Sequence, residues 1–312
     1  SETGLDADIE TFFFEGDVAS LFRFIDPDSV RKADYHVTIG RQPLVMQQGL
    51  LSMAPLDMIG ITRTSTYALG SNSTRATLLY AWDNLFRNDN RTDPNASMVG
   101  VSVAADYHKQ LWEFDALFVD SEPETGGDSW HAAIAVDTQI NVVNTTLRLL
   151  GSGVDGPDSA TASDGALLFG QFSVIQPFTE NLIYLNTFYG HDRFASAARA
   201  PSAGGPLGQT GILFAAVGMG RFAPALGNRA DHAFGAGLGW QIYTDAEKRS
   251  QWLLEAGFRN NRETGTGDAT AVAARYQQAL GRRTIALVEG YHAWRSGVED
   301  ITGLRAELRV KF

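Results

Sequence analysis

The last nine residues of the chain, 304–312, constrain its fold more than any other stretch. Apolar and charged side chains alternate there without a break: Leu304, Ala306, Leu308, Val310 and Phe312 are interleaved with Arg305, Glu307, Arg309 and Lys311. A period of two places every apolar side chain on one face of a strand and every charge on the other. The sequence therefore predicts a two-faced strand that closes on an aromatic residue.

The same alternation recurs along the chain and predicts a strand wherever it persists. Strands are expected at residues 11–25, 35–40, 57–67, 75–86, 99–107, 112–118, 132–140, 142–150, 166–175, 181–190, 234–242, 252–258, 272–276, 284–294 and 304–312. Many of these segments keep the pattern for about the 9–11 residues that a tilted strand needs to cross a bilayer. Residues 211–220 are mostly apolar without clear alternation, which fits either a strand or a segment packed inside a lumen.

An amphipathic final strand that ends on Phe312 resembles the last strand, or β-signal, of Gram-negative outer-membrane β-barrels. In that family the assembly machinery recognises this strand, which pairs with the first strand, and the resemblance implies both roles for the stretch from Leu304 to Phe312. A second stretch, Gly40-Arg41-Gln42, is similar to a motif of several outer-membrane porin families, including alginate-export-type porins. The resemblance implies an integral location in the bacterial outer membrane.

Strand length and the composition of the two faces favour a membrane barrel over a soluble sandwich. The polar face mixes Gly, Ser, Thr and Gln with single charges, which suits a polar lumen, and backbone groups cannot stay unpaired in lipid, so the strands must close on themselves. Aromatic residues near strand ends fit two interfacial girdles: Tyr107, Trp112, Phe118, Trp240, Trp252, Phe258, Tyr276 and Phe312. We predict one domain over residues 1–312, an all-β, transmembrane antiparallel β-barrel of about 16 strands, with about 14 as the alternative.

Three stretches interrupt the alternation and are expected to be loops. Residues 43–56 are expected to form a loop that can fold inward, and residues 151–164 and 195–209 are long loops rich in small and polar residues. Either residues 43–56 or residues 195–209 would narrow a channel.

Composition excludes some classes of function. The chain has no Cys, which rules out disulfides and thiolate sites and suits export through an oxidising compartment. Its formal net charge of −11 argues against nucleic acid as a partner.

Side chains expected on the inner face carry both signs of charge. The acidic members are Glu15, Asp17, Asp106, Glu113, Asp115, Asp137, Glu255 and Glu307, and the basic members are Arg23, Arg148, Arg259, Arg275, Arg305, Arg309 and Lys311. The basic residues gather in the last strands, whereas the acidic ones dominate the middle of the chain. One hypothesis is a transverse field that orients polar solutes and tunes ion selectivity. The other is that these charges pair across the lumen and only keep the wall rigid.

The function favoured by the sequence is a porin for passive diffusion of small polar solutes or ions. The alternative is a structural barrel that anchors or sheathes partner proteins of an outer-membrane complex. Lipid is the expected surrounding, and a homo-oligomer or a protein partner is compatible with either function. The two functions differ in whether the lumen is open, as in a porin, or filled by a partner, as in a structural barrel.

An enzyme is the least favoured function. A Gly-x-Ser-x-Gly motif is absent, and His191-Asp192 at a strand end is expected to be a surface pair rather than part of a dyad. The sequence indicates no cofactor, and no His, Asp or Glu set has convincing spacing for a metal ion.

Overall fold

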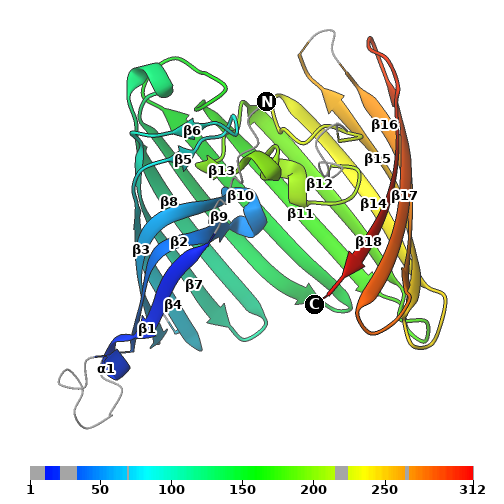
Figure 1. The fold of residues 1–312 in the computed structure, drawn as a ribbon, viewed down its shortest axis with the longest axis horizontal. Coiled ribbons are helices and arrows are strands. Elements are labelled where there is room, and N and C mark those ends of the chain that lie inside the picture. Colours follow the sequence, from blue (N-terminus) through cyan, green and yellow to red (C-terminus); the bar gives the residue numbers. More distant parts are fainter. Residues whose placement is uncertain (1–10, 22–33, 69, 215–223, 264–266, 312) are drawn as a thin grey trace, which may run out of the picture.

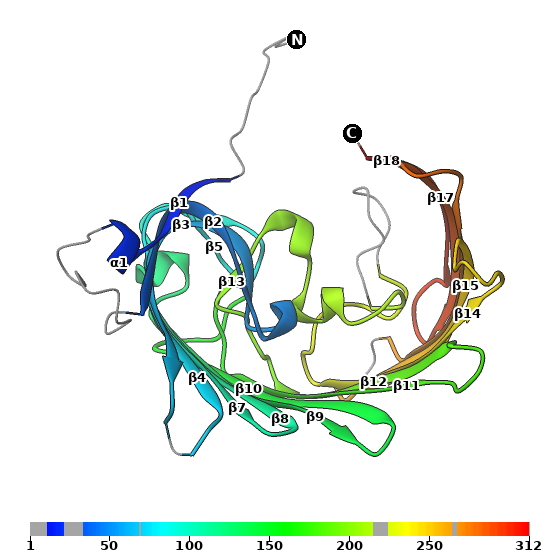
Figure 2. The same cartoon turned by 90° about the horizontal axis from the view of Figure 1, so that it is seen from below.

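A computed structural model describes residues 11–21, 34–68, 70–214, 224–263 and 267–311. One long antiparallel sheet curls around a set of inserted segments (Figures 1 and 2). None of the described helices is long and apolar enough to cross a membrane.

The sheet follows the chain order almost without exception. Its strands are β1 (Phe12–Asp17), β2 (Tyr35–Met46), β3 (Ser52–Thr66), β4 (Ser73–Ala81), β7 (Ser97–Tyr107), β8 (Gln110–Asp120), β9 (Ser129–Ile140), β10 (Val143–Val154), β11 (Gly165–Ile175), β12 (Leu182–Asp192), β14 (Ala233–Tyr243), β15 (Ser250–Asn261), β16 (Ala269–Ala279), β17 (Thr284–Arg295) and β18 (Ile301–Val310). A short strand, β13 (Ala198–Arg199), adds to β3 in parallel, which makes the sheet 16-stranded. The predicted all-β, antiparallel architecture is confirmed.

The two ends of the sheet face each other across an opening between β1 and β18 (Figure 2). Within the described residues no pairing joins these strands, so the expected pairing of the last strand with the first is not formed there. An even number of antiparallel steps separates β1 from β18, so the two run in the same direction and cannot form an antiparallel ladder.

The connections divide the sheet into two ends. We call the end with short turns, such as residues 108–109 and 141–142, the turn end. The other, the loop end, carries the longer connections, including residues 121–128 and 193–232. The loop end lies at the top of Figure 1.

Each strand separates an outer apolar face from an inner one. On β8, Phe114 and Phe118 are exposed on the outside, whereas Leu117 and Val119 are buried on the inside. Burial thus alternates from one residue to the next, as the period-two geometry of a strand requires. Of the aromatic residues expected near strand ends, Phe118, Trp240, Trp252 and Phe258 are exposed, and Phe312 lies outside the described residues.

The loop end of the interior is filled by the chain itself. The connection between β12 and β14 folds inward and carries β13, η3 (Pro201–Ala203) and η4 (Pro206–Gln209) (Figure 2). Its Leu207 and Phe214 are buried, as are Phe169 and Phe188 on the wall. The Phe188 and Phe214 rings meet edge to face with centroids 5.5 Å apart. The apolar core therefore sits between the inserted connection and the inner wall.

Two predicted strands were too long. The strand expected over residues 11–25 ends at Asp17, whose Oδ1 accepts a 2.8 Å hydrogen bond from Ser20 N–H and caps α1 (Val18–Leu21). Residues 22–33 lie outside the described residues. The strand expected over residues 75–86 breaks after Ala81 because Asp83 and Asn84 adopt positive φ. Beyond the break, β5 (Leu85–Phe86) pairs with β6 (Thr92–Asp93).

The prediction of a loop over residues 43–56 was wrong, because the loop in the structure is much shorter. Strand β2 continues to Met46 and β3 begins at Ser52, so only a tight turn with η1 (Gln47–Gly49) remains. Gln47 and Gln48 reverse the chain with positive φ. The turn does fold inward, because Leu50 is fully buried in the core. Of residues 211–220, those described, 211–214, belong to the inserted connection, and 215–220 lie outside the described residues.

Candidate functional site

The first group of inner charges lies on β8, β9 and β10. Arg148 is buried, and its Nη2 atom lies 3.6 Å from Asp137 Oδ2 and 4.0 Å from Glu113 Oε2. The three side chains meet because they occupy inward positions at similar heights on adjacent strands: Arg148 pairs with Ala135 and Glu113 pairs with Ala135 from the other side. One cation thus stands between two predicted carboxylates.

Asp115 lies two residues after Glu113 on the same face of β8. It connects the wall to the inserted β2–β3 turn. It accepts a 2.5 Å hydrogen bond from Gln47 Nε2. Both residues are buried, so this contact fixes the turn of residues 47–51 against β8.

The second group of charges lies on β16, β17 and β18. Glu289 is buried and pairs with Arg275 Nη2 at 2.5 Å and with Arg305 Nε at 3.0 Å. Arg305 and Arg309 both reach Glu307, at 3.5 Å and 2.5 Å. The basic residues expected in the last strands are therefore brought together, but two carboxylates are interleaved with them. The sequence analysis did not include Glu289 among the inner residues. Its pairing opposite Arg275 and Arg305 in the strand register is what identifies it as one.

Glu255 on β15 contacts Tyr184, a residue that the sequence analysis did not single out. It accepts a hydrogen bond from the Tyr184 hydroxyl on β12, and its Oε1 atom lies 3.4 Å from Ile212 N of the inserted connection. Tyr184 reaches across β14 because Gly239 lies under its ring. A Cβ at Gly239 would stand 2.1 Å from Tyr184 Cζ.

Arg259, near the loop end of β15, holds the inserted connection as well. Its guanidinium donates to the carbonyl of Arg229 and, through Nε, to Asn261 Oδ1 at 3.0 Å. Among the predicted inner residues, Asp115, Glu255 and Arg259 thus contact inserted segments directly.

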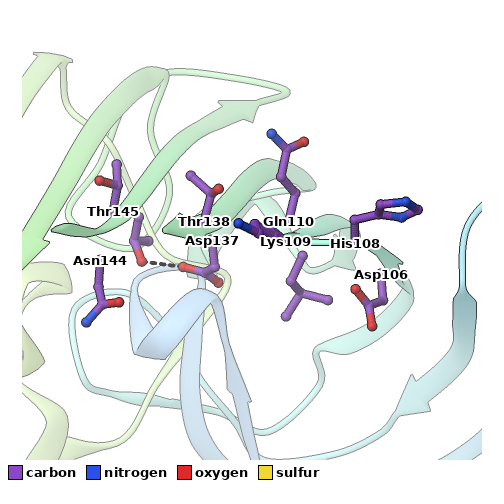
Figure 3. A pocket seen from close by; sticks show the side chains of 10 residues that line it. Asp106, His108, Lys109, Gln110, Asp137, Thr138, Asn144 and Thr145 are labelled. Atoms are coloured by element: carbon purple, nitrogen blue, oxygen red, sulfur yellow. Dashed lines mark hydrogen bonds between the residues drawn. The ribbon is translucent and has the colours of Figure 1, made fainter. Parts of the chain in front are cut away.

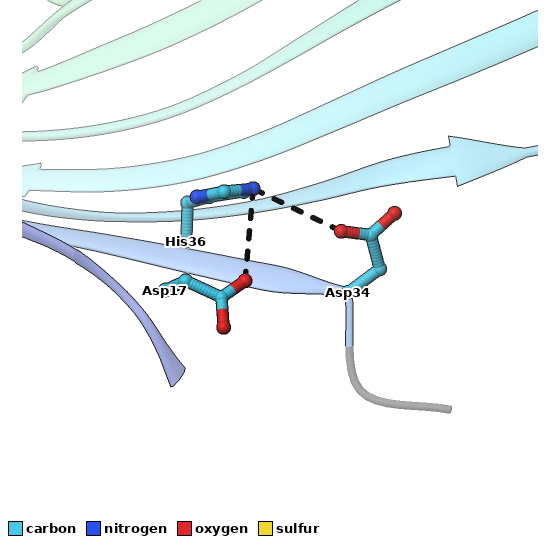
Figure 4. A group of neighbouring side chains, drawn as sticks. All are labelled: Asp17, Asp34 and His36. Carbon is cyan, nitrogen blue, oxygen red and sulfur yellow. Dashed lines mark ion pairs between the residues drawn. The ribbon is translucent and has the colours of Figure 1, made fainter. Parts of the chain in front are cut away.

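The remaining predicted inner residues lie apart from both groups. Glu15 pairs with Thr38 in the β1–β2 ladder, and Arg23 lies outside the described residues. Asp17, Asp34 and His36 gather near one end of β1 and β2, with His36 Nε2 4.0 Å from Asp17 and 3.8 Å from Asp34 (Figure 4). One ligating atom from each lies within 4.8 Å of the others, so this set could hold a metal ion. No metal-binding spacing was evident in the sequence at this set, because Asp17 and His36 belong to different strands.

Arg199 organises the inserted connection and was not predicted. The side chain is fully buried, and its donors reach the carbonyls of Gly49, Ala203, Gly204 and Gly205 at 2.5–3.1 Å. Burial, with a smaller effect of the Arg229 cation, lowers the pKa of Arg199 to about 9. Arg199 thereby joins the β2–β3 turn to the β12–β14 connection.

Two polar cavities open on the inner wall towards the turn end. One, of about 500 Å³, includes Asp106, Asp137, Asn144 and Thr146 (Figure 3). The other, of about 240 Å³, shares Asn144 and Thr146 with the first. The first group of charges lies beside both cavities, through Asp137 in one and the 3.5 Å contact of Arg148 with Gln171 in the other.

Comparison with known proteins finds likeness in structure alone. No protein-family model matches the sequence, and no curated protein matches it. The fold is similar to that of OccK11 (OpdR) of Pseudomonas aeruginosa, with 12% identity, a TM-score of 0.59, and coverage of 89% of this chain and 77% of that one. It is also similar to two crystal structures of OccK1 (OpdK) of the same organism, one of them with vanillate, each with 11% identity, a TM-score of 0.57, and coverage of 89% of this chain and 75% of that one. Because these neighbours are outer-membrane porins, the chain has a porin-like β-barrel fold.

Proposed function

We propose that the protein is an integral outer-membrane channel for passive diffusion of small polar solutes or ions, with residues 1–312 as a single barrel domain. The observation that carries this proposal is the contrast between the two faces of the wall. Its outer face exposes apolar side chains, and its inner face borders polar cavities. Lipid outside and water inside would satisfy both faces.

The outer face supports the proposed location. Val99, Val101, Phe114, Leu147 and Leu149 are all more than 40% exposed on neighbouring strands. Contiguous apolar surface of this kind marks contact with a membrane or a protein. The porin-like fold favours the membrane.

The inner face supports a lined passage. The proposed pore-lining residues are Glu15, Asp17, Arg23, Asp106, Glu113, Asp115, Asp137, Arg148, Glu255, Arg259, Arg275, Arg305, Glu307 and Arg309. The group on β8–β10 has more carboxylates than cations, whereas the group on β16–β18 has more cations than carboxylates, and the two stand on opposite sides of the interior (Figure 2). Pairing within each group stiffens the wall, and the difference between the groups sustains a transverse field.

The other functions receive less support. A sheath needs room for a partner, whereas here the chain's own β12–β14 connection occupies the interior at the loop end. His191 and Asp192 lie 3.4 Å apart and are both exposed at the rim, as an ordinary surface pair would be. We further propose that β18 is the strand read by the assembly machinery and that any self-association uses the outer face.

Ion selectivity in planar bilayers tests the proposal. Arg309→Glu changes an exposed side chain of the basic group and should shift the permeability ratio towards cations roughly twofold. The matched control is Arg249→Glu, because Arg249 is exposed in the turn between β14 and β15, away from the inner wall. A silent bilayer from folded protein, or equal selectivity of both variants, would contradict a channel lined by these residues.

A further inference from the structure

The smaller of the two wall cavities has a composition of its own. It lies on β10, β11 and β12, and its lining is Asn144, Thr146, Gln171, Phe172, Ser173, Tyr184 and Asn186. Every polar group in this set is an amide or a hydroxyl, and none carries a formal charge at neutral pH. The cavity therefore interrupts the charged inner wall with a neutral polar surface.

Charges next to the cavity are already paired. Arg148 stands between Asp137 and Glu113, and Glu255 accepts the Tyr184 hydroxyl. A charged solute in the cavity would have to compete with these pairs. A neutral solute would not, because hydroxyl groups can exchange hydrogen bonds with amides while the ion pairs stay intact.

Hydrogen bonds within the protein determine which donors and acceptors of the cavity remain available to a bound solute. Asn186 donates its amide to the Thr210 carbonyl, which leaves its Oδ1 as an acceptor. Gln171 accepts from Arg148 Nη1 at 3.5 Å, which turns its amide NH2 into the available donor. Thr146 donates to Asp137 and so presents lone pairs, and Asn144 is exposed with both functions. Donors and acceptors thus alternate over adjacent strands, as neighbouring hydroxyls of a solute require.

The shape of the cavity fits a ring-sized solute. Its volume of about 240 Å³ is below the ~300–1,000 Å³ of sites for drug-sized ligands. The Tyr184 ring is held against the Gly239 backbone and forms part of the lining, so it offers a flat surface at a fixed place. Asn144 and Thr146 also line the larger cavity, which gives the solute a route towards the turn end.

We propose that this cavity is a binding subsite for a neutral polyhydroxylated solute, such as one sugar unit, on the wall of the channel. The subsite rests on the proposed channel function for its access, but its binding chemistry is independent of ion conduction. The amides of Asn144 and Gln171 recognise the hydroxyl groups, and the Tyr184 ring supports the apolar face of the sugar.

The test combines two measurements on folded full-length protein, with glucose and maltose as probes and benzoate as the charged comparison. Calorimetry in detergent measures binding, and planar bilayers measure interruption of the ion current by the sugar. Asn144→Leu and Gln171→Leu should each weaken sugar binding roughly three- to tenfold, because each replaces a hydrogen-bonding amide with an apolar side chain of similar size. The control is Gln277→Leu, an amide on the distant strand β16 and outside both cavities, which should bind sugar as the unchanged protein does.

The outcomes separate the subsite from the channel. A conducting protein that binds neither sugar, or that binds benzoate in preference, overturns the subsite and leaves the channel intact. Sugar binding by a folded protein that never conducts refutes the channel and supports the subsite. Equal weakening by Gln277→Leu and Gln171→Leu would show that the sugar does not occupy this cavity.

Discussion

The two ends of the interior are built on different principles. At the loop end the chain fills its own interior with the inserted connection, which is held by apolar contacts and by hydrogen bonds to backbone carbonyls, as at Leu207 and Arg199. At the turn end the wall borders polar cavities, and its contacts include ion pairs such as Arg309 with Glu307. Different parts of one wall thus carry the packed interior and the polar cavities. In the proposed channel, the loop end would narrow the passage and the turn end would supply its polar contacts.

The largest expected effect comes from breaking the loop end at Arg199. Arg199→Met leaves several buried carbonyls without a donor, and we expect it to lower the free energy of unfolding by about 3–5 kcal/mol. Urea unfolding and limited proteolysis of residues 193–214 would measure this. Arg193→Met is the matched control, because Arg193 is exposed in the same connection. Equal stability of the two variants would show that Arg199 does not anchor the connection.

A smaller effect should distinguish the outer face from the inner one on a single strand. Leu147→Arg places a cation on the exposed outer face of β10 and should cost about 2–4 kcal/mol if that face meets lipid. Thr146→Arg, on the adjacent inner position, borders the polar cavities and should cost less. Unfolding of both variants from lipid vesicles makes the comparison. The reverse order would mean that the faces have been assigned the wrong way round.

The smallest effect concerns a polar contact at the loop end. Burial raises the pKa of Asp93, but hydrogen bonds from Ser121, Thr125 and the Asn95 N–H, with the Arg87 cation, outweigh it and hold that pKa below its usual value. A lowered carboxyl pKa contributes stability above the unfolded value, and this stability is lost as the pH falls through the folded value. Asp93→Asn should therefore cost about 1–2 kcal/mol at neutral pH and progressively less in acid.

The melting temperature as a function of pH checks this expectation. Asp155→Asn is the control, because Asp155 is exposed in the connection between β10 and β11 at the same end. A gap between unchanged protein and Asp93→Asn that stays constant down to acidic pH would contradict the ionised state of Asp93.

The sequence predicted the parts of the fold that depend on local pattern. Strands such as β8 and β18 were found because period-two alternation is a property of neighbouring residues. The breaks at Asp17 and Asp83 were missed because a cap and a positive φ overrode apolar residues that continue the pattern. Residues 195–209 were expected to be a long loop, which is confirmed, but its internal contacts were not foreseen.

The candidate site was predicted as a set of charges rather than as contacts. Arg275, Arg305 and Arg309 were expected together, and they do share carboxylates. Their buried partner Glu289 was left out because its strand alternates weakly, and only the register with β16 and β18 reveals it. Arg199 could not be foreseen, because its partners Gly49 and Gly205 are brought together only by the fold.

The most direct test of the account is single-channel conductance before and after removal of residues 195–209, replaced by a short Gly-Ser linker. If the inserted connection narrows a passage whose turn end is open, the shortened protein should conduct several-fold more current per channel with the sign of its selectivity unchanged. An equal conductance of the two folded proteins, or none from either, would contradict the division between a constricting loop end and an open turn end.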